Sequence, residues 1–275
     1  HRVLVVDLDP QANATTGLGL DHRSVERSTY DLLTGDAAAS QVILETAISG
    51  CDCMPASLDL AGSEIELVGA MAREHKLAEA LRDVVEVYDL VFVDCPPSLG
   101  LLTLNALVAA DDLIVPVQCE YYALEGLGQL LQTAGRVRRS LNPDLKITGF
   151  VMTMFDARTK LAGQVADDVR SHFGPLVFQT VVPRSVRLSE APSFGEPVVT
   201  LDPGSRGSTA YRLLAAEIED RYGLARPSPP PPPPARETRR ETQSPVPGHS
   251  GRGYGVATPI PAGVGAAWPV REPWS

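Results

Sequence analysis

The sequence lacks the features that mark membrane and secreted proteins. No segment approaches the roughly eighteen uninterrupted apolar residues of a membrane-spanning helix, and the first residues have neither the basic start nor the apolar run of a secretory signal. Basic residues are also scarce, since 24 Lys and Arg stand against 34 Asp and Glu, and the formal net charge is −10 at pH 7. We therefore expect a soluble, cytoplasmic protein in which any contact with nucleic acid comes from a local basic patch.

Cysteine is rare and is not spaced for cross-links. The four cysteines are Cys51, Cys53, Cys95 and Cys119. Because none of them forms a C-x-x-C pair, neither a disulfide framework nor a zinc site is favoured, and we expect small reduced core residues. Cys51 and Cys53 could share a metal ion, but no His or further Cys lies close in sequence to complete a ligand set.

A phosphate-binding loop is absent as well. Nucleoside triphosphates are commonly held by a Gly-rich loop of the form G-x-x-x-x-G-K-[ST], whose backbone N–H groups and lysine bind the phosphates. That pattern occurs nowhere in the sequence. The stretch "TTGLGLD" has two glycines but no lysine and no evident strand-to-helix setting, so we reject it as a substitute.

The composition changes sharply after Gly223, which divides the chain into a body, 1–223, and a tail, 224–275. The tail holds 13 of the 24 prolines and six Arg against three Glu, and it shows no apolar periodicity. It cannot bury enough surface to offset its ordering entropy, so we expect disorder, with a polyproline II stretch at 229–234. Subtracting its charge of +3 from −10 leaves the body near −13.

The body alternates short apolar runs with helical patterns, which predicts a doubly wound α/β fold around a mostly parallel sheet. The expected strands are 3–8, 90–94, 113–117, 147–154 and 176–182, and their nearly continuous apolar character suits strands covered on both faces. The expected helices are 63–87, 99–109, 124–141, 161–172 and 208–222. Such folds bind ligands at the carboxyl ends of their strands.

Acidic and polar residues follow three of these strands. Asp7 and Asp9 end the first strand on one face, Asp94 ends the second, and Gln118 to Glu120 follow the third. An acid at the end of a buried strand is what a nucleotide site uses to hold magnesium, usually through water. Each place read alone is equally consistent with a turn acid or a helix cap, but three together favour a phosphate and magnesium site.

Several longer strings resemble one protein family in order along the chain. They are "VLVVDLDPQANATTGLG", "MPASLDLAGSEIEL", "VFVDCPPSLGLLTLNAL", "VPVQCEYYALEGLGQL", "TMFDART", "VPRSVRLSEAPSFGEPV" and "DPGSRG". Together they resemble the chromosome- and plasmid-partitioning ATPases of the ParA/Soj type, from Arg2 to about Gly223. The resemblance implies ATP and Mg²⁺ as cofactors and a P-loop NTPase type of fold.

The resemblance also implies roles for the residues at the strand ends. Asp9 matches the acid that orients the attacking water, and Asp7 matches its neighbour near the magnesium ion. Asp94 matches the Walker B acid, which also belongs to the magnesium site. Residues 118–122, beginning with Gln118, match the second switch, which reports the γ-phosphate, and Pro183 lies where the family packs adenine.

Members of this family bind DNA nonspecifically as ATP-bound homodimers, associate with the nucleoid, and are released when a ParB-type partner stimulates hydrolysis. Arg158 and Arg187 match basic positions of that activity, and Arg184 and Lys160 lie nearby in sequence and widen the patch. The alternative is that these arginines only solvate the surface or pair with acids. No basic amphipathic helix of the MinD kind closes the chain, so we expect no membrane attachment.

The family begins one β-α unit earlier, with a strand, the deviant Walker A loop "KGGVGKT" and a helix, and that unit is absent from this sequence. We therefore expect the doubly wound sheet to lack its first β-α unit and to expose the edges of two interior strands. The complete protein is expected to be an ATPase and this chain alone to be inactive. The alternatives are a non-catalytic remnant that acts only by binding, a MinD-like positioning ATPase, and a metal-cluster carrier.

Overall fold

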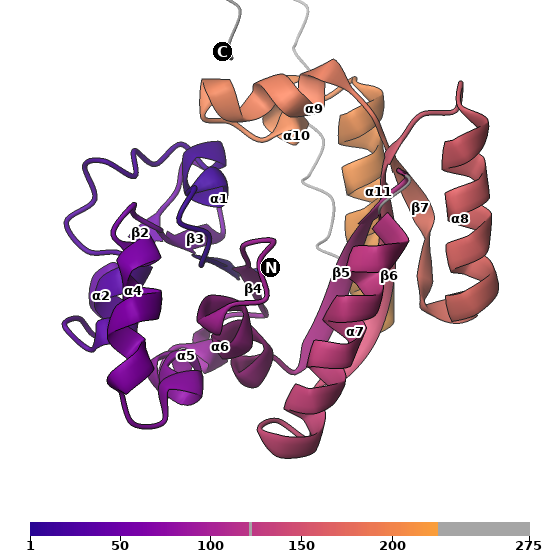
Figure 1. The fold of residues 1–275 in the computed structure, drawn as a ribbon. Coiled ribbons are helices and arrows are strands. Elements are labelled where there is room, and N and C mark those ends of the chain that lie inside the picture. Colours follow the sequence, from indigo (N-terminus) through magenta and orange to yellow (C-terminus); the bar gives the residue numbers. More distant parts are fainter. Residues whose placement is uncertain (121–122, 225–275) are drawn as a thin grey trace, which may run out of the picture. The chain divides into compact units, whose positions relative to one another are not determined.

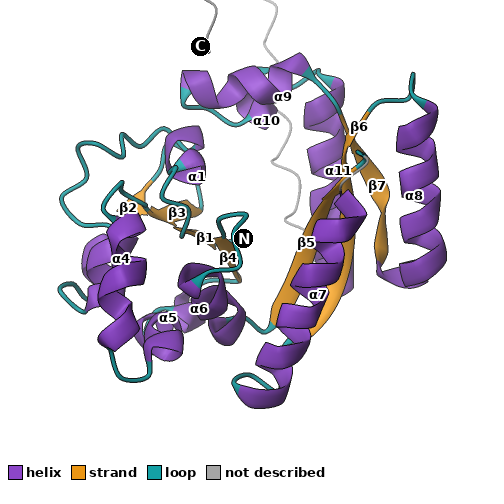
Figure 2. Cartoon of the chain, viewed as in Figure 1, coloured by secondary structure: helices purple, strands orange, loops and turns teal. Residues whose placement is uncertain are grey.

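This computed structural model of the protein describes residues 1–120 and 123–224, and positions 123–125 only as backbone. The predicted tail lies outside the described residues except for Leu224, and so do Tyr121 and Tyr122 of the predicted second switch (Figure 1). The strands form two sheets with the orders β2-β3-β1-β4 and β5-β6-β7 (Figure 2). Every strand pair is parallel except β2 with β3. The predicted α/β fold with mostly parallel sheets is therefore confirmed.

The first sheet is built around β1. Its strands are β1 (Val3–Asp7), β2 (Leu44–Glu45), β3 (Cys51–Met54) and β4 (Leu90–Asp94). Leu4 and Val6 project from one face of β1 into a core formed with the helices that cover that face. Those helices are α2 (Thr29–Thr34), α3 (Ala39–Val42), α4 (Leu60–Glu66), α5 (Lys76–Leu81) and α6 (Leu101–Ala109).

The opposite face of this sheet is only partly covered by the described residues. Phe92 of β4 is 39% exposed, and Val3 and Val5 of β1 are partly buried. The expectation that all strands are covered on both faces is therefore wrong for β1 and β4 in the part of the chain that the structure describes.

The second sheet is covered on both faces. Its strands are β5 (Asp112–Gln118), β6 (Lys146–Phe155) and β7 (Val177–Pro183). On one face Phe150 and Met152 pack with α7 (Ala123–Ser140) and α8 (Lys160–Phe173), and on the other Val151 packs with α11 (Arg206–Tyr222) (Figure 1). Alternate residues of β6 thus serve two separate cores, as the period of two in a strand requires.

Within the described residues, β4 pairs only with β1 and β5 pairs only with β6. Each therefore forms an edge of its sheet, as the sequence predicts for two strands. The two halves of the molecule contact one another through α6 and α7, where Leu107 and Val108 pack on Ala134 and Val137.

The expected helix at 63–87 is wrong. The structure divides this region into α4, the 3₁₀ turns η1 (Leu67–Gly69) and η2 (Arg73–His75), α5, and η3 (Val85–Val87). Ala70 is extended and Ala72 has a left-handed φ of 49°, so the backbone leaves the helix after Gly69. The apolar spacing continues across this break, which is why it indicated one helix.

Two further helices follow strands that carry candidate residues. The turn after β1 leads into α1 (Asn13–Gly17), and "TTGLGLD" covers the last residues of this helix and the segment after it, so its glycines do not lie in the strand-to-helix turn. After β7 come α9 (Val186–Glu190), η5 (Ala191–Phe194) and α10 (Val198–Leu201), while η4 (Gly174–Leu176) precedes that strand.

The cysteines behave as small reduced residues. All four are free, and Cys53 and Cys119 are buried. No group of three His, Cys, Asp or Glu residues able to hold a metal ion occurs among the described residues. The described helices also include none that is both long and apolar enough to cross a membrane.

Candidate functional site

The first candidate site lies at the carboxyl ends of β1 and β4. Asp7 and Asp94 occupy paired positions in the parallel register of these two strands. The chain continues the pairing by one residue, because Leu8 N donates a hydrogen bond to Asp94 O at 2.8 Å. The predicted convergence of Asp7 and Asp94 at one sheet edge is therefore present, with Asp9 two residues further along the chain.

Asp7 is completely buried, and its carboxylate accepts three hydrogen bonds. Oδ2 accepts hydrogen bonds from Thr15 N at 2.8 Å and Thr15 Oγ1 at 2.7 Å, and Oδ1 accepts one from Asp9 N at 3.1 Å. Burial raises the pKa of Asp7, while the hydrogen bonds from Thr15 and Asp9 oppose that rise. These contacts make Asp7 the anchor of the turn between β1 and α1.

Thr15 connects Asp7 to a further segment of the chain, the loop after β3. Its hydroxyl oxygen, which donates to Asp7, also accepts a hydrogen bond from Ala56 N at 2.9 Å. Thr29 Oγ1 donates to the backbone oxygen of Asp7 at 2.8 Å. The end of β1, the start of α1, the start of α2 and the loop after β3 are thus joined through buried polar contacts around one carboxylate.

Asp9 lies in the turn and is partly exposed. Its Oδ1 accepts a hydrogen bond from Gln11 N at 3.0 Å, and its backbone oxygen accepts one from Ala12 N at 2.8 Å. Ala12 takes a left-handed φ of 54° to enter α1, which turns the chain sharply after Pro10. Asp9 is therefore held by a local turn and remains accessible to a ligand.

Asp94 is exposed at the end of β4. Desolvation among the strand ends, followed by the like charges of Asp7 and Asp9, raises the pKa of Asp94 to about 6. None of the three acids takes part in an ion pair with a basic side chain of the described residues. A cation at this edge would relieve their mutual repulsion.

The available carboxylates suit a magnesium ion that has most of its ligands from outside the protein. No group of three acids among the described residues forms a complete site, and three hydrogen bonds already occupy much of the Asp7 carboxylate, so the protein offers few free carboxylate oxygens. Magnesium bound with nucleotides typically uses one or two carboxylates, with phosphates and water as the remaining ligands. The arrangement therefore fits a magnesium ion that arrives with phosphates.

The third strand end lies in the other sheet. Gln118 ends β5 and is exposed, and Cys119 N donates a hydrogen bond to Thr153 O of β6 at 2.9 Å. No hydrogen bond or ion pair among the described residues joins Gln118 to Asp7, Asp9 or Asp94. The structure therefore brings two of the three predicted strand ends together and leaves the role of Gln118 a prediction.

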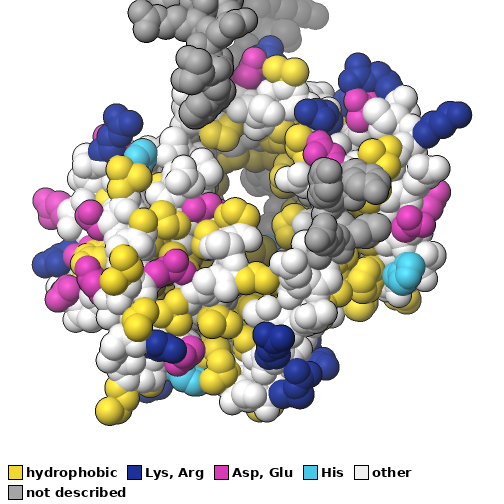
Figure 3. Space-filling view, in the orientation of Figure 1, with side chains coloured by type: hydrophobic (Ala, Val, Ile, Leu, Met, Phe, Trp, Pro, Cys, Tyr) yellow, Lys and Arg dark blue, Asp and Glu magenta, His cyan; other side chains and the backbone are white. Residues whose placement is uncertain are grey.

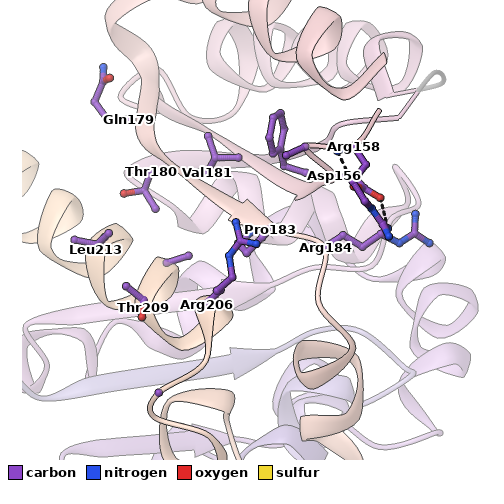
Figure 4. A pocket seen from close by; sticks show the side chains of 14 residues that line it. Asp156, Arg158, Gln179, Thr180, Val181, Pro183, Arg184, Arg206, Thr209 and Leu213 are labelled. Atoms are coloured by element: carbon purple, nitrogen blue, oxygen red, sulfur yellow. Dashed lines mark hydrogen bonds and ion pairs between the residues drawn. The ribbon is translucent and has the colours of Figure 1, made fainter. Parts of the chain in front are cut away.

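A cleft of about 980 Å³ opens beside the ends of β6 and β7. Phe155, Val181, Pro183 and Leu213 supply apolar surface, and the lining also contains Thr180 and Thr209 (Figure 4). Three arginines, Arg158, Arg184 and Arg206, line the same cleft. Pro183, predicted to pack adenine, and two of the predicted DNA-binding residues thus share one cavity.

Three of the four predicted DNA-binding side chains are ion-paired. Arg158 Nε and Nη2 donate to the two carboxylate oxygens of Asp156 at 2.9 and 2.7 Å, and this pair holds the pKa of Asp156 well below its usual range. Arg184 Nη1 lies 3.3 Å from Glu120 Oε1. Arg187 contacts two acids, Glu190 at 3.2 Å and Asp202 at 3.4 Å. Lys160 is exposed at the start of α8.

Similarity to known proteins places the chain in a family. A family model described as an AAA domain matches residues 1–147. The chain is 53% identical to the sporulation initiation inhibitor protein Soj of Bacillus subtilis over 217 residues, which cover 79% of this chain and 86% of Soj. The chain belongs to the ParA/Soj family of partitioning ATPases.

Solved structures agree with this assignment. A cobyrinic acid a,c-diamide synthase of Mycobacterium smegmatis with bound ATP analogue and magnesium is 38% identical, with a TM-score of 0.68 over 81% of this chain and 84% of that protein. The septum site-determining protein MinD of Pyrococcus horikoshii, complexed with Mg-ADP, is 26% identical, with a TM-score of 0.63 over 81% of this chain and 85% of MinD. The ParA/Soj chain therefore has an α/β fold of the P-loop NTPase type, and these two structural neighbours were solved with nucleotide and magnesium.

Sequence reasoning missed three residues that organise these sites. Thr15 is one of two adjacent threonines, and nothing in the sequence marks it as the partner of Asp7. Arg206 lies within "DPGSRG", which was noted as a family string without a role for its arginine. Glu217 accepts hydrogen bonds from Gln179 N at 2.8 Å and Thr180 N at 2.7 Å along the edge of β7, a contact between residues 37 or 38 positions apart.

Proposed function

We propose that this ParA/Soj chain belongs to an ATP-dependent partitioning switch that dimerises on ATP, binds DNA nonspecifically, and hydrolyses ATP under the influence of a ParB-type partner. The paired placement of Asp7 and Asp94, with Asp9 two residues beyond, is the observation that carries the nucleotide assignment. The 53% identity to a Soj protein favours this activity over that of the diamide synthase, which matches at 38%.

In this proposal the three acids have different tasks. Exposed Asp94 holds magnesium, through water or directly, and Asp9 accepts a hydrogen bond from the attacking water and orients it. Buried Asp7 keeps its predicted place near the magnesium ion and also acts by positioning, because its hydrogen bonds with Thr15 and Asp9 N fix the turn that carries Asp9. Bound magnesium would supply charge neutralisation for the phosphates.

We further propose that the phosphates are held by a strand, a "KGGVGKT"-type loop and a helix that are not part of the printed sequence. Within the described residues, β4 and β5 each have one edge without a partner strand, and this supports the proposal. A single added parallel strand could form hydrogen bonds with β4 on one side and with β5 on the other. The exposed Phe92 supports it as well, since a helix after that loop would find apolar surface on β4. Reading the codons upstream of His1 tests it, and a frame without such a loop would contradict it for this gene.

We assign the binding of adenine to the cleft beside β7, and the binding of DNA to basic side chains in and near this cleft. Pro183 and Phe155 offer apolar surface for adenine, and Gln118 and its neighbours serve as the switch that reports the γ-phosphate. Arg158, Arg184, Arg187 and Lys160 bind DNA phosphates, which gives sequence-independent and salt-sensitive binding despite the acidic body. The protein would accordingly act in the cytoplasm on the nucleoid.

ATPase measurements on two forms of the protein test the catalytic part. The chain extended by its upstream residues is expected to hydrolyse ATP, to respond to a ParB-type partner, and to lose turnover in Asp9→Ala. Residues 1–275 alone are expected to show no turnover, because the groups that stabilise the transferring phosphoryl charge are missing. Steady turnover of the 275-residue chain that Asp9→Ala abolishes would overturn the inactive assignment. An inactive extended chain would instead favour a protein that acts only by binding.

A further inference from the structure

The region of α4 and η1 is apolar on both of its sides. Its inner side is buried through Leu60, Ser63 and Leu67, which are 0, 0 and 3% exposed. Its outer side carries Leu58, Ala61, Ile65 and Val68, all exposed, with Leu58, Ile65 and Val68 at 65, 80 and 61%. The outer residues follow one another at intervals of three, four and three: Ala61 and Ile65 lie on one face of α4, Leu58 lies in the turn before it, and Val68 lies in η1. We refer to these four residues as the outer stripe.

The outer stripe cannot be buried by turning the helix. The inner side is fixed in the core of the first sheet, and Glu64 Oε1 accepts a hydrogen bond from Leu101 N of α6 at 2.8 Å. Gly100 accommodates this contact, because a Cβ there would lie only 2.0 Å from Glu64 Oε1. Scattered single apolar residues on a surface need no explanation, but four at helical spacing on a rigid support do.

Acidic side chains border the outer stripe. Tyr30 Oη donates a hydrogen bond to Glu66 Oε2 at 3.0 Å, and this bond, together with the charges of Glu66, Asp36 and Asp59, raises the pKa of Tyr30. Asp59 and Glu66 are both exposed, and they directly follow Leu58 and Ile65 of the outer stripe in the chain. Figure 3 shows hydrophobic and acidic side chains next to one another on this part of the surface.

At the Val68 end of the outer stripe, a basic side chain, Arg73, is paired with an acidic one, Glu74. Arg73 Nη1 donates to the backbone oxygen of Val68 at 2.7 Å, while its Nε contacts Glu74 Oε1 at 3.0 Å. A second copy of this chain docked on this surface would bring a second acidic border into the same interface, on a molecule that already carries a net charge of −10. The surface therefore opposes symmetric self-association and favours a positively charged occupant.

We propose that the outer stripe docks a basic amphipathic helix of a partner protein, with apolar anchors on Ile65 and Val68 and basic residues facing Asp59 and Glu66. Taken at the helical rise per residue, the span from Leu58 to Val68 is about 15 Å, which matches a partner segment of about three turns with anchors at helical spacing. This proposal does not depend on nucleotide binding, so it stands or falls separately from the proposed function.

A pair of synthetic peptides tests the proposal with the full 275-residue chain. The first peptide has about 14 residues, four helical turns, of Leu and Lys with the leucines on one face. The second has the same lysines with Ser in place of Leu. By fluorescence anisotropy, the Leu/Lys peptide is expected to bind the parent chain at least about tenfold more tightly than the Ser/Lys peptide.

Variants then locate the binding. Ile65→Asp is expected to weaken the Leu/Lys complex at least about tenfold, and Leu58→Ser to weaken it about threefold or more. The matched control Val186→Asp changes an equally exposed apolar residue, 72% exposed on α9, and is expected to leave affinity within about twofold. Asp59→Asn is expected to weaken binding about twofold and to reduce its dependence on salt. Circular dichroism verifies that each variant folds like the parent.

Two results would overturn the proposal. Equal loss of affinity in Ile65→Asp and Val186→Asp would mean that the peptide does not bind at the outer stripe. A parent chain that sedimentation velocity shows to be a dimer, and that Ile65→Asp converts to a monomer, would assign the stripe to a second copy instead.

Discussion

Asp7 and Asp94 occupy neighbouring positions in the register of β1 and β4, yet one is completely buried and the other is exposed. Asp7 accepts three hydrogen bonds from Thr15 and Asp9, whereas Asp94 mainly experiences desolvation and the charges of Asp7 and Asp9. Two identical side chains at one sheet edge are therefore suited to different tasks by their surroundings. Asp7 holds the turn in place, and Asp94 remains available to a cation.

The raised pKa of Asp94 predicts a pH-dependent gain of stability in Asp94→Asn. The folded-state pKa of about 6 lies above the ordinary value of 3.8, so the folded chain holds this proton more tightly than the unfolded chain does. Ionised Asp94 therefore costs stability above pH 6, and the cost disappears as the pH falls through 6 towards 4. After discounting for solvent exposure, we expect Asp94→Asn to gain about 1 kcal/mol at pH 7.5 and nothing at pH 3.5.

Urea unfolding of the nucleotide-free chain at several pH values measures this difference. Asp144→Asn changes an exposed acid in the loop before β6 and serves as the control, with an expected effect within about 0.5 kcal/mol at every pH. An Asp94→Asn variant that is less stable than the parent at pH 7.5 would contradict the placement of Asp94 among uncompensated charges.

Thr15 is predicted to be essential for the buried network. Thr15→Val removes the hydroxyl that donates to Asp7 and accepts from Ala56 N, so two buried polar groups lose a partner. We expect unfolding free energy to fall by about 2–4 kcal/mol, measured by urea denaturation. Thr15→Ser keeps the hydroxyl and is expected to recover most of that loss. Equal effects of the two substitutions would show that the methyl group, and not the hydroxyl, matters.

The sequence predicts the elements with strong patterns and misses those defined by long-range pairing. Apolar runs located β1, β4, β5, β6 and β7 within about two residues, because each strand is a nearly continuous run of apolar residues in the sequence. The short strand β3 was not expected, since "CDCM" has neither a long apolar run nor β-branched residues and exists through its pairing with β1. The broken region after α4 was missed because apolar spacing continues through the extended Ala70.

The candidate site, too, could be predicted from the sequence only in part. Strand ends carrying Asp7 and Asp94 were predictable, because parallel neighbours bring their carboxyl ends to one edge. The burial of Asp7 was not, because it depends on Thr15 and on Ala56, which lies 41 residues further along the chain. The neutralisation of Arg158 and Arg184 by Asp156 and Glu120 likewise appears only in the folded chain.

The Arg184–Glu120 pair predicts that removing an acid strengthens DNA binding. Glu120 lies after β5, two residues beyond Gln118, and its carboxylate partly neutralises the predicted DNA-binding guanidinium of Arg184 at 3.3 Å. For the complete protein with ATP, Glu120→Gln is expected to tighten binding to nonspecific DNA by about twofold to fivefold at low salt. Arg184→Gln is expected to weaken it and to reduce the slope of log K against log salt by about 1.

Glu79→Gln provides the control for a general change of charge, because Glu79 is an exposed acid on α5. Mobility-shift titrations at two or more salt concentrations distinguish the variants. If Glu120→Gln and Glu79→Gln strengthen binding equally, the effect is one of net charge and the ion pair has no specific role.

Glu217 is predicted to protect the free edge of β7. Its carboxylate accepts hydrogen bonds from Gln179 N, Thr180 N and the Thr180 hydroxyl, so a side chain of α11 occupies donors that would otherwise be open to another strand. Glu217→Ala leaves these donors to water or to a second molecule. We expect a loss of about 1–2 kcal/mol in urea unfolding and a faster rise of light scattering on mild heating. Glu217→Gln retains one acceptor oxygen and is expected to fall between the parent and Glu217→Ala in both measurements. Scattering that rises equally in the parent and in Glu217→Ala would mean that aggregation begins elsewhere, for example at the open edges of β4 and β5.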